Sequence, residues 1–132
     1  CAGMVNPFLS HAFLAALGRL RDNGVKIALD DVGLGQSNFK MMIDVRPDYL
    51  KIDRYFVIAC DTDPRRRAVI EAIASLAGRF GAGVVAEGVE SQPVVSTLSH
   101  LGVNLMQGFW FSHPLTSQAA SHYAGRMRVP VR

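Results

Sequence analysis

The sequence predicts an α/β fold in which short parallel strands alternate with helices. Three stretches repeat one order: an amphipathic helix, a glycine that stops it, a valine, and an apolar strand that ends at a polar residue. The glycine–valine junctions are Gly24-Val25, Gly83-Val84 and Gly102-Val103. Strands that alternate with helices in this way are typical of βαβ units in a parallel sheet. No linker or low-complexity segment interrupts the 132 residues, so we expect one domain or part of one.

Turn and capping residues predict where each element begins and ends. We expect Asn6 to cap and Pro7 to open the first helix, because an amide in the first turn has no helical partner to lose. Asn23-Gly24 would stop this helix in a left-handed cap. The expected helices begin near residues 6, 38, 63, 91 and 114, and the expected strands are 25–31, 49–53, 83–89 and 103–111. Helical spacing predicts buried faces at Leu9, Phe13, Ala16, Leu17 and Leu20, at Val69, Ile70, Ile73, Leu76, Ala77 and Phe80, and at Val94, Val95, Leu98 and Leu101.

The composition argues against several classes of protein. The chain is 49% hydrophobic and 19% charged, which is enough apolar material for a packed core. Its net charge of +3 is spread out apart from Arg65-Arg66-Arg67 and residues 126–132, so we expect no nucleic acid polymer as partner and interpret the arginine triplet as a solvated helix start. No apolar run approaches the roughly 20 residues that cross a bilayer, so we expect no membrane insertion. Cys1 and Cys60 make no disulfide framework, which favours a reducing, cytoplasmic location.

Polar residues mark the ends of all four expected strands. Side chains alternate between the two faces of a strand. In each expected strand, one of the two faces carries a polar residue near the carboxyl end. The carboxyl ends of parallel strands meet at the mouth of a (β/α) barrel or at one edge of an open sheet, where such folds bind ligands. Taken singly, each residue has an ordinary role as a turn, cap, ion-pair or core residue, but together they favour a functional site. The residues expected to converge are Asp30, Asp31, Lys51, Asp53, Glu87 and Gln107.

The adjacent acids Asp30 and Asp31 open a loop that contains Gly33 and Gly35. Two carboxylates this close repel each other unless a cation or several hydrogen-bond donors lie between them. The pair is therefore a candidate metal site. The loop is an incomplete match to a dinucleotide-binding motif because Asn38 stands where a third glycine is required, and the four histidines show no zinc-ligand spacing.

Four segments resemble, in order and spacing, successive motifs of the EAL domain family: DDVGLGQSNF, PDYLKIDRYFV, VVAEGVES and LGVNLMQGFWFSHPL. The resemblance extends over about residues 24–115. It implies a TIM-like (β/α)8 barrel that serves bacterial signalling by hydrolysing cyclic di-GMP to the linear dinucleotide. It also implies Mg2+ or Mn2+ as cofactor, with two ions in the complete domain.

The same resemblance implies a role for each candidate residue. Asp30 would bridge both ions, Asp31 would bind the second ion, and Glu87 would complete that second site or hold the loop after Asp31. Lys51 would orient the attacking water and offset phosphate charge. A phosphodiester needs an activated water, charge neutralisation and a stabilised leaving oxygen, all of which a metal pair supplies. The residues that would position the dinucleotide are Asp53 and Gln107.

The sequence also departs from the family pattern. Val32, Leu34 and Gln36 replace the usual phenylalanine, threonine and tyrosine of the loop, and residues 1–7 lack the glutamate-bearing strand end that supplies other ligands. We therefore expect residues 1–132 to be the C-terminal half of an EAL domain, without its N-terminal half, and to be inactive alone. An open half barrel leaves bare sheet edges and an apolar face, so we expect a homodimer or association with the missing half. The alternative is a degenerate EAL domain that acts as a cyclic di-GMP receptor or a protein-interaction module.

Overall fold

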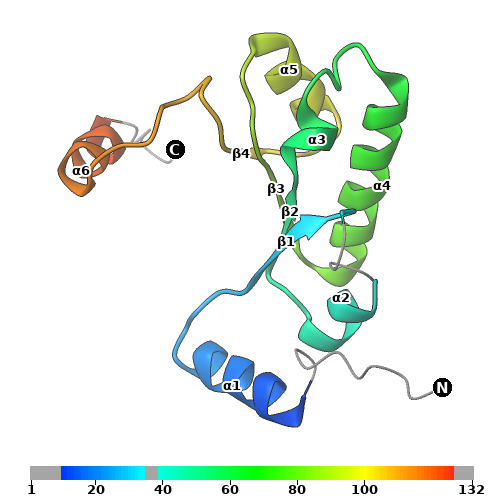
Figure 1. Cartoon of the computed structure of the whole chain (residues 1–132), viewed down its shortest axis with the longest axis vertical. Coiled ribbons are helices and arrows are strands. Elements are labelled where there is room, and N and C mark those ends of the chain that lie inside the picture. The colour runs from blue at the N-terminus through cyan, green and yellow to red at the C-terminus, as the bar shows by residue number, and fades with distance from the viewer. Residues whose placement is uncertain (1–9, 35–38, 127–132) are drawn as a thin grey trace, which may run out of the picture.

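The computed structural model describes residues 10–34 and 39–126 of the chain, and its centre is a parallel sheet of four strands (Figure 1). The strands lie in the order β1-β2-β3-β4, which is also their order in the chain. Their bounds are Ala28–Val32 (β1), Tyr49–Ile52 (β2), Gly83–Ala86 (β3) and Leu105–Met106 (β4). All three neighbouring pairs are parallel, and Lys51 pairs with Val85, which pairs with Leu105. The predicted α/β class with four parallel strands is confirmed.

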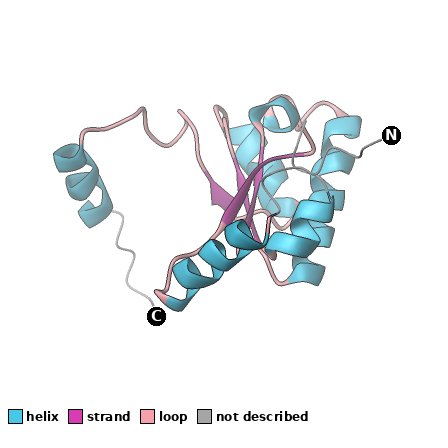
Figure 2. Cartoon of the chain, turned by 60° about the horizontal axis from the view of Figure 1, so that its bottom comes forward, coloured by secondary structure: helices cyan, strands magenta, loops and turns pink. Residues whose placement is uncertain are grey.

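The helices crowd on one side of this sheet. Figure 2 shows the middle helices packed beside the strands, whereas the last helix stands apart at the end of an extended arm and the first helix reaches away from the sheet. A hydrogen bond from the Tyr123 hydroxyl to the carbonyl of Phe111, at 3.2 Å, joins that last helix to the arm. The bounds are His11–Asp22 (α1), Phe39–Val45 (α2), Arg54–Val57 (α3), Pro64–Phe80 (α4), Gln92–His100 (α5) and Ser117–Arg126 (α6).

The hydrophobic core lies between the sheet and the helices on its covered side. In β2, Leu50 and Ile52 are buried while Lys51 between them is only partly buried, so the predicted alternation is confirmed. Opposite them, α4 and α5 bury a subset of their predicted apolar faces. The buried residues of these two helices are Ile70, Ile73, Ala77, Val94 and Leu98.

The first helix differs from its prediction. It begins at His11 and is capped by Ser10, whose hydroxyl accepts a hydrogen bond from the Phe13 amide at 3.2 Å. Among the described residues of its expected apolar face, only Leu17 is buried, and Leu20 is 45% exposed, because α1 contacts α2 instead of lying on the sheet. The predicted left-handed stop is confirmed at Gly24, whose φ is +78°. The sites of Asn6, Pro7, Leu9, Gln36 and Asn38 lie outside the described residues.

The strands are shorter than predicted, and the reasons are local. Asp53 does not extend β2, because its side chain accepts a hydrogen bond from the Tyr55 amide at 2.6 Å and caps α3, a helix that the sequence pattern did not predict. After Met106 the chain turns, with a hydrogen bond from the Phe111 amide to the Gly108 carbonyl, and Gly108 packs so closely on Val89 that a Cβ there would lie 2.1 Å from the Val89 carbonyl oxygen. The prediction of Asp63 as the cap of α4 is confirmed, since its Oδ1 accepts from the Arg65 amide at 2.8 Å.

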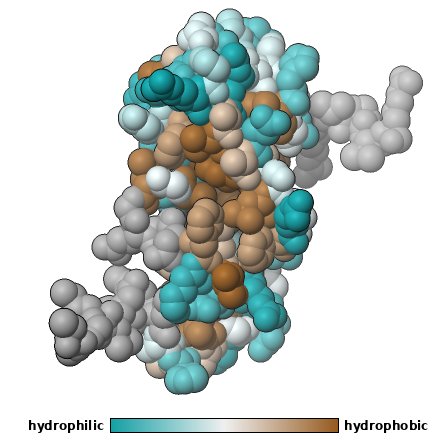
Figure 3. Space-filling model, turned by 90° about the vertical axis from the view of Figure 1, so that its right-hand side faces the viewer, coloured by the Kyte–Doolittle hydropathy of each residue, from teal (hydrophilic) through white to brown (hydrophobic). Residues whose placement is uncertain are grey.

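Two surfaces remain apolar. On the side where the helices lie, apolar side chains gather in the middle of the face (Figure 3), and the exposed large apolar residues of α2 and α4 are Phe39, Ile43, Val69 and Phe80. On the other side of the sheet, Val85 is partly buried and Leu105 is 47% exposed, as expected for a sheet face without covering helices. Among the described helices, none is both long enough and apolar enough to cross a membrane.

Candidate functional site

Lys51 is the centre of a cluster of charges at the carboxyl ends of three adjacent strands. Its Nζ lies 3.1 Å from Asp30 Oδ1 and 2.6 Å from Glu87 Oε1. The Lys51 and Glu87 side chains are 25% and 22% exposed, and that of Asp30 is 59% exposed. The hydrogen bond with Glu87 raises the pKa of Lys51 above its ordinary value, although burial opposes the rise and Asp30 supports it. Lys51 is therefore a firmly charged ammonium group between two carboxylates.

The sheet itself brings this cluster together. Leu50 and Ile52 anchor β2 in the core, so Lys51 must face the uncovered side. Glu87 follows β3 directly, and its amide donates to the Ile52 carbonyl at 3.0 Å, which continues the pairing of the two strands by one residue. Because β2 lies between β1 and β3, a cation on β2 can contact an acid from each neighbour.

The two acids of β1 form a bulge opposite Lys51. Leu29 pairs with Leu50 and Val32 with Ile52, so Asp30 and Asp31 together face the single residue of β2 between those pairs. Asp31 has a φ of +52°, an uncommon conformation for a residue other than glycine, and its amide donates to Asp30 Oδ1 at 3.0 Å. Bulges of this kind occur next to active sites, where they redirect a side chain.

The other two predicted residues lie differently. Gln107 is exposed and lines an open depression of about 520 Å3 on the uncovered sheet face, together with Tyr49, Lys51, Val85 and Leu105. Its backbone bonds to the neighbouring strand, since its amide donates to Ala86 and its carbonyl accepts from Val89. Asp53 is the cap of α3. The structure thus brings Asp30, Lys51 and Glu87 into direct contact and places Gln107 in the same depression as Lys51.

A second ion pair, which the sequence analysis missed, lies beside the first. Arg54 Nη2 is 2.9 Å from Glu90 Oε1, and both side chains are exposed. Lys51 and Arg54 are three residues apart, as are Glu87 and Glu90. This matching spacing, of two cations at the end of one strand and two acids just after the next strand, is the signal that could have revealed the pair.

The chemistry of the cluster suits a cation, although its ligand set is small. Carboxylate oxygens are the preferred ligands of hard divalent ions, and Asp30 and Glu87 already enclose a positive group. Within residues 10–34 and 39–126, no three side chains among histidine, cysteine, aspartate and glutamate lie together as a metal-binding group. The residues that could contribute oxygen ligands are Asp30, Asp31 and Glu87.

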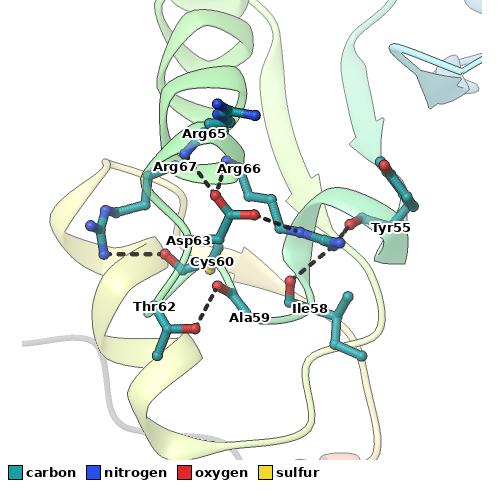
Figure 4. A network of polar contacts seen from close by, with 9 residues as sticks. All are labelled: Tyr55, Ile58, Ala59, Cys60, Thr62, Asp63, Arg65, Arg66 and Arg67. Atoms are coloured by element: carbon teal, nitrogen blue, oxygen red, sulfur yellow. Dashed lines mark hydrogen bonds and ion pairs between the residues drawn. The ribbon is translucent and has the colours of Figure 1, made fainter.

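The arginine triplet has a structural role instead of the solvated one that the sequence suggested. Arg66 binds the carbonyls of Tyr55 and Ile58 and the Asp63 carboxylate, and its guanidinium lies 4.8 Å from the centre of the Tyr55 ring (Figure 4). Arg67 donates to the carbonyls of Asp61, at 2.7 Å, and Cys60. Two of the three arginines therefore hold the loop between α3 and α4, because that loop directs its carbonyls towards the first turn of α4.

The comparison of sequences finds one protein family. A model of the family described as "EAL domain" matches residues 7–114. The probable cyclic di-GMP phosphodiesterase PdeN of Escherichia coli is 45% identical over 96 residues, which are 73% of this chain and 18% of PdeN. The probable cyclic di-GMP phosphodiesterase PdeG of the same organism is 33% identical over 108 residues, or 82% of this chain and 21% of PdeG. The chain thus spans about a fifth of the length of these relatives.

Solved structures give the same result. The EAL domain of Mycobacterium smegmatis DcpA has a TM-score of 0.82 and 36% identity, over 88% of this chain and 52% of that one. A manganese and cyclic di-GMP complex of Klebsiella pneumoniae BlrP1 has a TM-score of 0.72 and 34% identity, over 79% of this chain and 26% of that one. Both similarities cover most of this chain and a smaller share of the other.

Proposed function

The chain belongs to the EAL domain family, and we propose that it forms part of a metal-dependent phosphodiesterase that hydrolyses cyclic di-GMP to the linear dinucleotide. Its fold is that of four strands from a TIM-like barrel of the EAL type. The observation that carries the proposal is Lys51 held between Asp30 and Glu87 at the ends of three adjacent parallel strands. The names of PdeN and PdeG and the ligand of the BlrP1 complex support this choice of substrate.

The charged cluster gives each residue a role in this chemistry. Asp30, Asp31 and Glu87 would hold magnesium or manganese, which when bound supply Lewis-acid activation of a water molecule. Lys51 would place its ammonium beside the phosphodiester and offset its negative charge, and would orient the attacking water. The raised pKa of Lys51 supports this role, because the group stays protonated at neutral pH.

We place the dinucleotide in the depression that Lys51 and Gln107 share. The Gln107 side-chain amide offers both a donor and an acceptor to a ligand there. Asp53 would contribute through the part of its carboxylate that does not cap α3. Because the substrate is a bacterial second messenger, the proposal places the protein in the cytoplasm.

We further propose which part of the EAL domain these residues form. Residues 1–132 would form the C-terminal half of the EAL domain, which agrees with coverage of 52% of the DcpA EAL domain chain. The uncovered sheet face with Leu105 would then be closed by the other half of the barrel or by a second copy of the chain. On its own, the chain is expected to show no turnover.

The test is an assay of the complete domain with cyclic di-GMP, in which chromatography follows the linear dinucleotide. We expect hydrolysis with Mg2+ or Mn2+ and none after chelation with EDTA. Turnover that persists in EDTA contradicts the proposal. Tight binding of cyclic di-GMP without hydrolysis at any metal concentration would instead favour a receptor, an alternative suggested by Val32 and Leu34 at the loop positions where the family pattern has phenylalanine and threonine.

A further inference from the structure

We infer that Arg54 and Glu90 are positioning residues, which hold the segment 87–90 so that Glu87 stays in contact with Lys51. The inference rests on the proposed function for its catalytic consequence, but its geometry stands independently. Arg54 Nη2 lies 2.9 Å from Glu90 Oε1, beside the Lys51–Glu87 contact of 2.6 Å. Two ion pairs therefore reach the segment after β3, one from Lys51 within β2 and one from Arg54 just after β2.

The two pairs differ in exposure, and the difference indicates what each one does. The Arg54 and Glu90 side chains are 57% and 41% exposed, against 25% and 22% for Lys51 and Glu87. An exposed ion pair adds little to the stability of a fold. The outer pair can still restrict where the backbone of residues 87–90 lies, which fixes the inner pair.

Gly88 makes this arrangement possible. Its φ is +69°, so the chain turns sharply directly after Glu87. The stem of the Arg54 side chain occupies the space where a side chain at position 88 would be, since a Cβ there would lie 2.4 Å from Arg54 Cγ. Arg54 thus packs on the turn with its stem and binds Glu90 beyond the turn with its guanidinium.

The opposite side of the segment is held by backbone contacts. The Val89 amide donates to the Gln107 carbonyl at 3.0 Å, and the Val89 carbonyl accepts from the Trp110 amide at 3.0 Å. Val89 itself is fully buried. The segment is therefore fixed towards β4 by these main-chain hydrogen bonds, towards β2 by the bond from the Glu87 amide to the Ile52 carbonyl, and towards α3 by Arg54. Loss of the Arg54 contact releases one side of the segment, and Glu87 is its first residue.

The test compares three variants of the chain by amide hydrogen exchange. Arg54→Met keeps a stem over Gly88 but removes the charge, Glu90→Gln removes the charge of the partner, and Arg54→Lys keeps both stem and charge. We expect exchange at the Glu87 and Val89 amides to be about threefold to fivefold faster in Arg54→Met and Glu90→Gln, which is the opening expected from loss of an exposed ion pair. Arg54→Lys should stay close to the wild type, and the Ile73 amide in α4 should be unchanged throughout.

Arg65→Met is the matched control, because it removes an exposed arginine from the start of α4. Unchanged exchange at Glu87 and Val89 in both charge-removing variants overturns the inference. Equal acceleration in α4 also overturns it, since the pair would then support the whole fold. If Arg54→Lys is accelerated as much as Arg54→Met, a positive charge at this position does not hold the segment, and the inference is likewise overturned.

The catalytic consequence is measured separately in the complete domain. A small displacement of Glu87 slows a reaction that depends on its position. Arg54→Met should therefore lower kcat by about tenfold with little change in KM, and Arg54→Lys should keep most of the wild-type kcat. A change in KM alone, or no change in either constant, overturns the positioning role. A wild-type domain without hydrolysis would refute the proposed function, whereas the exchange experiment would still decide whether Arg54 holds the segment.

Discussion

Lys51 of β2 and Glu87, the residue directly after β3, are joined by a contact of 2.6 Å between Nζ and Oε1. Both side chains are partly buried, and the hydrogen bond raises the pKa of Lys51. Asp30 approaches the same ammonium from the other side at 3.1 Å. The positive charge is therefore the feature that allows two carboxylates to remain close together at this point of the sheet.

Replacement of Lys51 by alanine should lower turnover far more than stability. The change removes the ammonium that would face the phosphodiester, and we expect a loss of about 100-fold or more in kcat. Lys51 packs no apolar surface comparable to that of Leu50 or Ile52, so the Tm of Lys51→Ala should shift by only a few degrees. Hydrolysis assays and thermal melts of the complete domain measure the two effects. A large fall in Tm with full activity would show that Lys51 is structural.

Asp30→Asn should abolish hydrolysis while the fold persists. The side chain is 59% exposed and lies in a bulge, so neutralising it disturbs no packed face, but it removes an oxygen ligand of a cation. Circular dichroism and the hydrolysis assay should be compared with Asp44→Asn. That control makes the same chemical change in α2, where Asp44 pairs with Lys40. Activity retained in Asp30→Asn would exclude this residue from the reaction.

The stability of the chain should decrease in acid through Asp63. Hydrogen bonds from the amides of Arg65 and Arg66 and from the Arg66 side chain, that of the Arg65 amide foremost, hold the pKa of Asp63 below its ordinary value of 3.8. A carboxyl group with a lowered pKa stabilises the fold above pH 3.8, and this contribution is lost as the pH falls through the lower value. Asp63→Asn keeps a capping side chain at every pH, so its unfolding free energy should depend less on pH in this range. Urea titrations between pH 2 and 6 measure the difference, and parallel profiles for the two proteins would contradict it.

Two glycine substitutions should change stability in opposite directions. Gly88→Ala places a Cβ 2.4 Å from Arg54 Cγ at a φ of +69°, so we expect a loss of about 1–3 kcal/mol. Gly78→Ala lies within α4 with no atom within 4 Å of the added Cβ, so we expect a gain of about 0.5–1 kcal/mol from helix propensity. Denaturant unfolding of both variants gives the values. Equal effects of the two substitutions would show that the turn at Gly88 is not strained by a side chain.

The isolated chain should associate through its uncovered sheet face. Leu105 is 47% exposed there, and burial of apolar surface contributes about 25 cal/mol per Å2. We expect light scattering at micromolar concentration to report a dimer or larger species, and Leu105→Lys to weaken it. Leu20→Lys is the matched control, because Leu20 is 45% exposed on α1. A monomeric wild-type chain with a cooperative melt would contradict this expectation.

The positions of the site residues in the strands could be predicted from sequence, because side-chain alternation depends only on local geometry. Leu50 and Ile52 had to enter the core, and this placed Lys51 on the opposite face. The end of β2 could not be predicted in the same way, since Asp53 suits both a strand and a helix cap. It is a cap here because its side chain accepts a hydrogen bond from the Tyr55 amide. The limited burial of α1 could not be predicted from sequence either, because the burial of its apolar residues depends on which element the helix packs against. The pairing of Arg54 with Glu90 could not be predicted, because the two residues are distant in sequence and meet only through the turn at Gly88.

The Cys60 thiol can report when the loop between α3 and α4 opens. The thiol is fully buried beside the carbonyls that Arg66 and Arg67 hold, and burial raises its pKa. A thiol reagent can react with such a group only after the loop has opened. In a variant with Cys1 replaced by serine, the rate of labelling would therefore time the opening of this loop in the folded protein, with no added fluorophore or engineered cysteine.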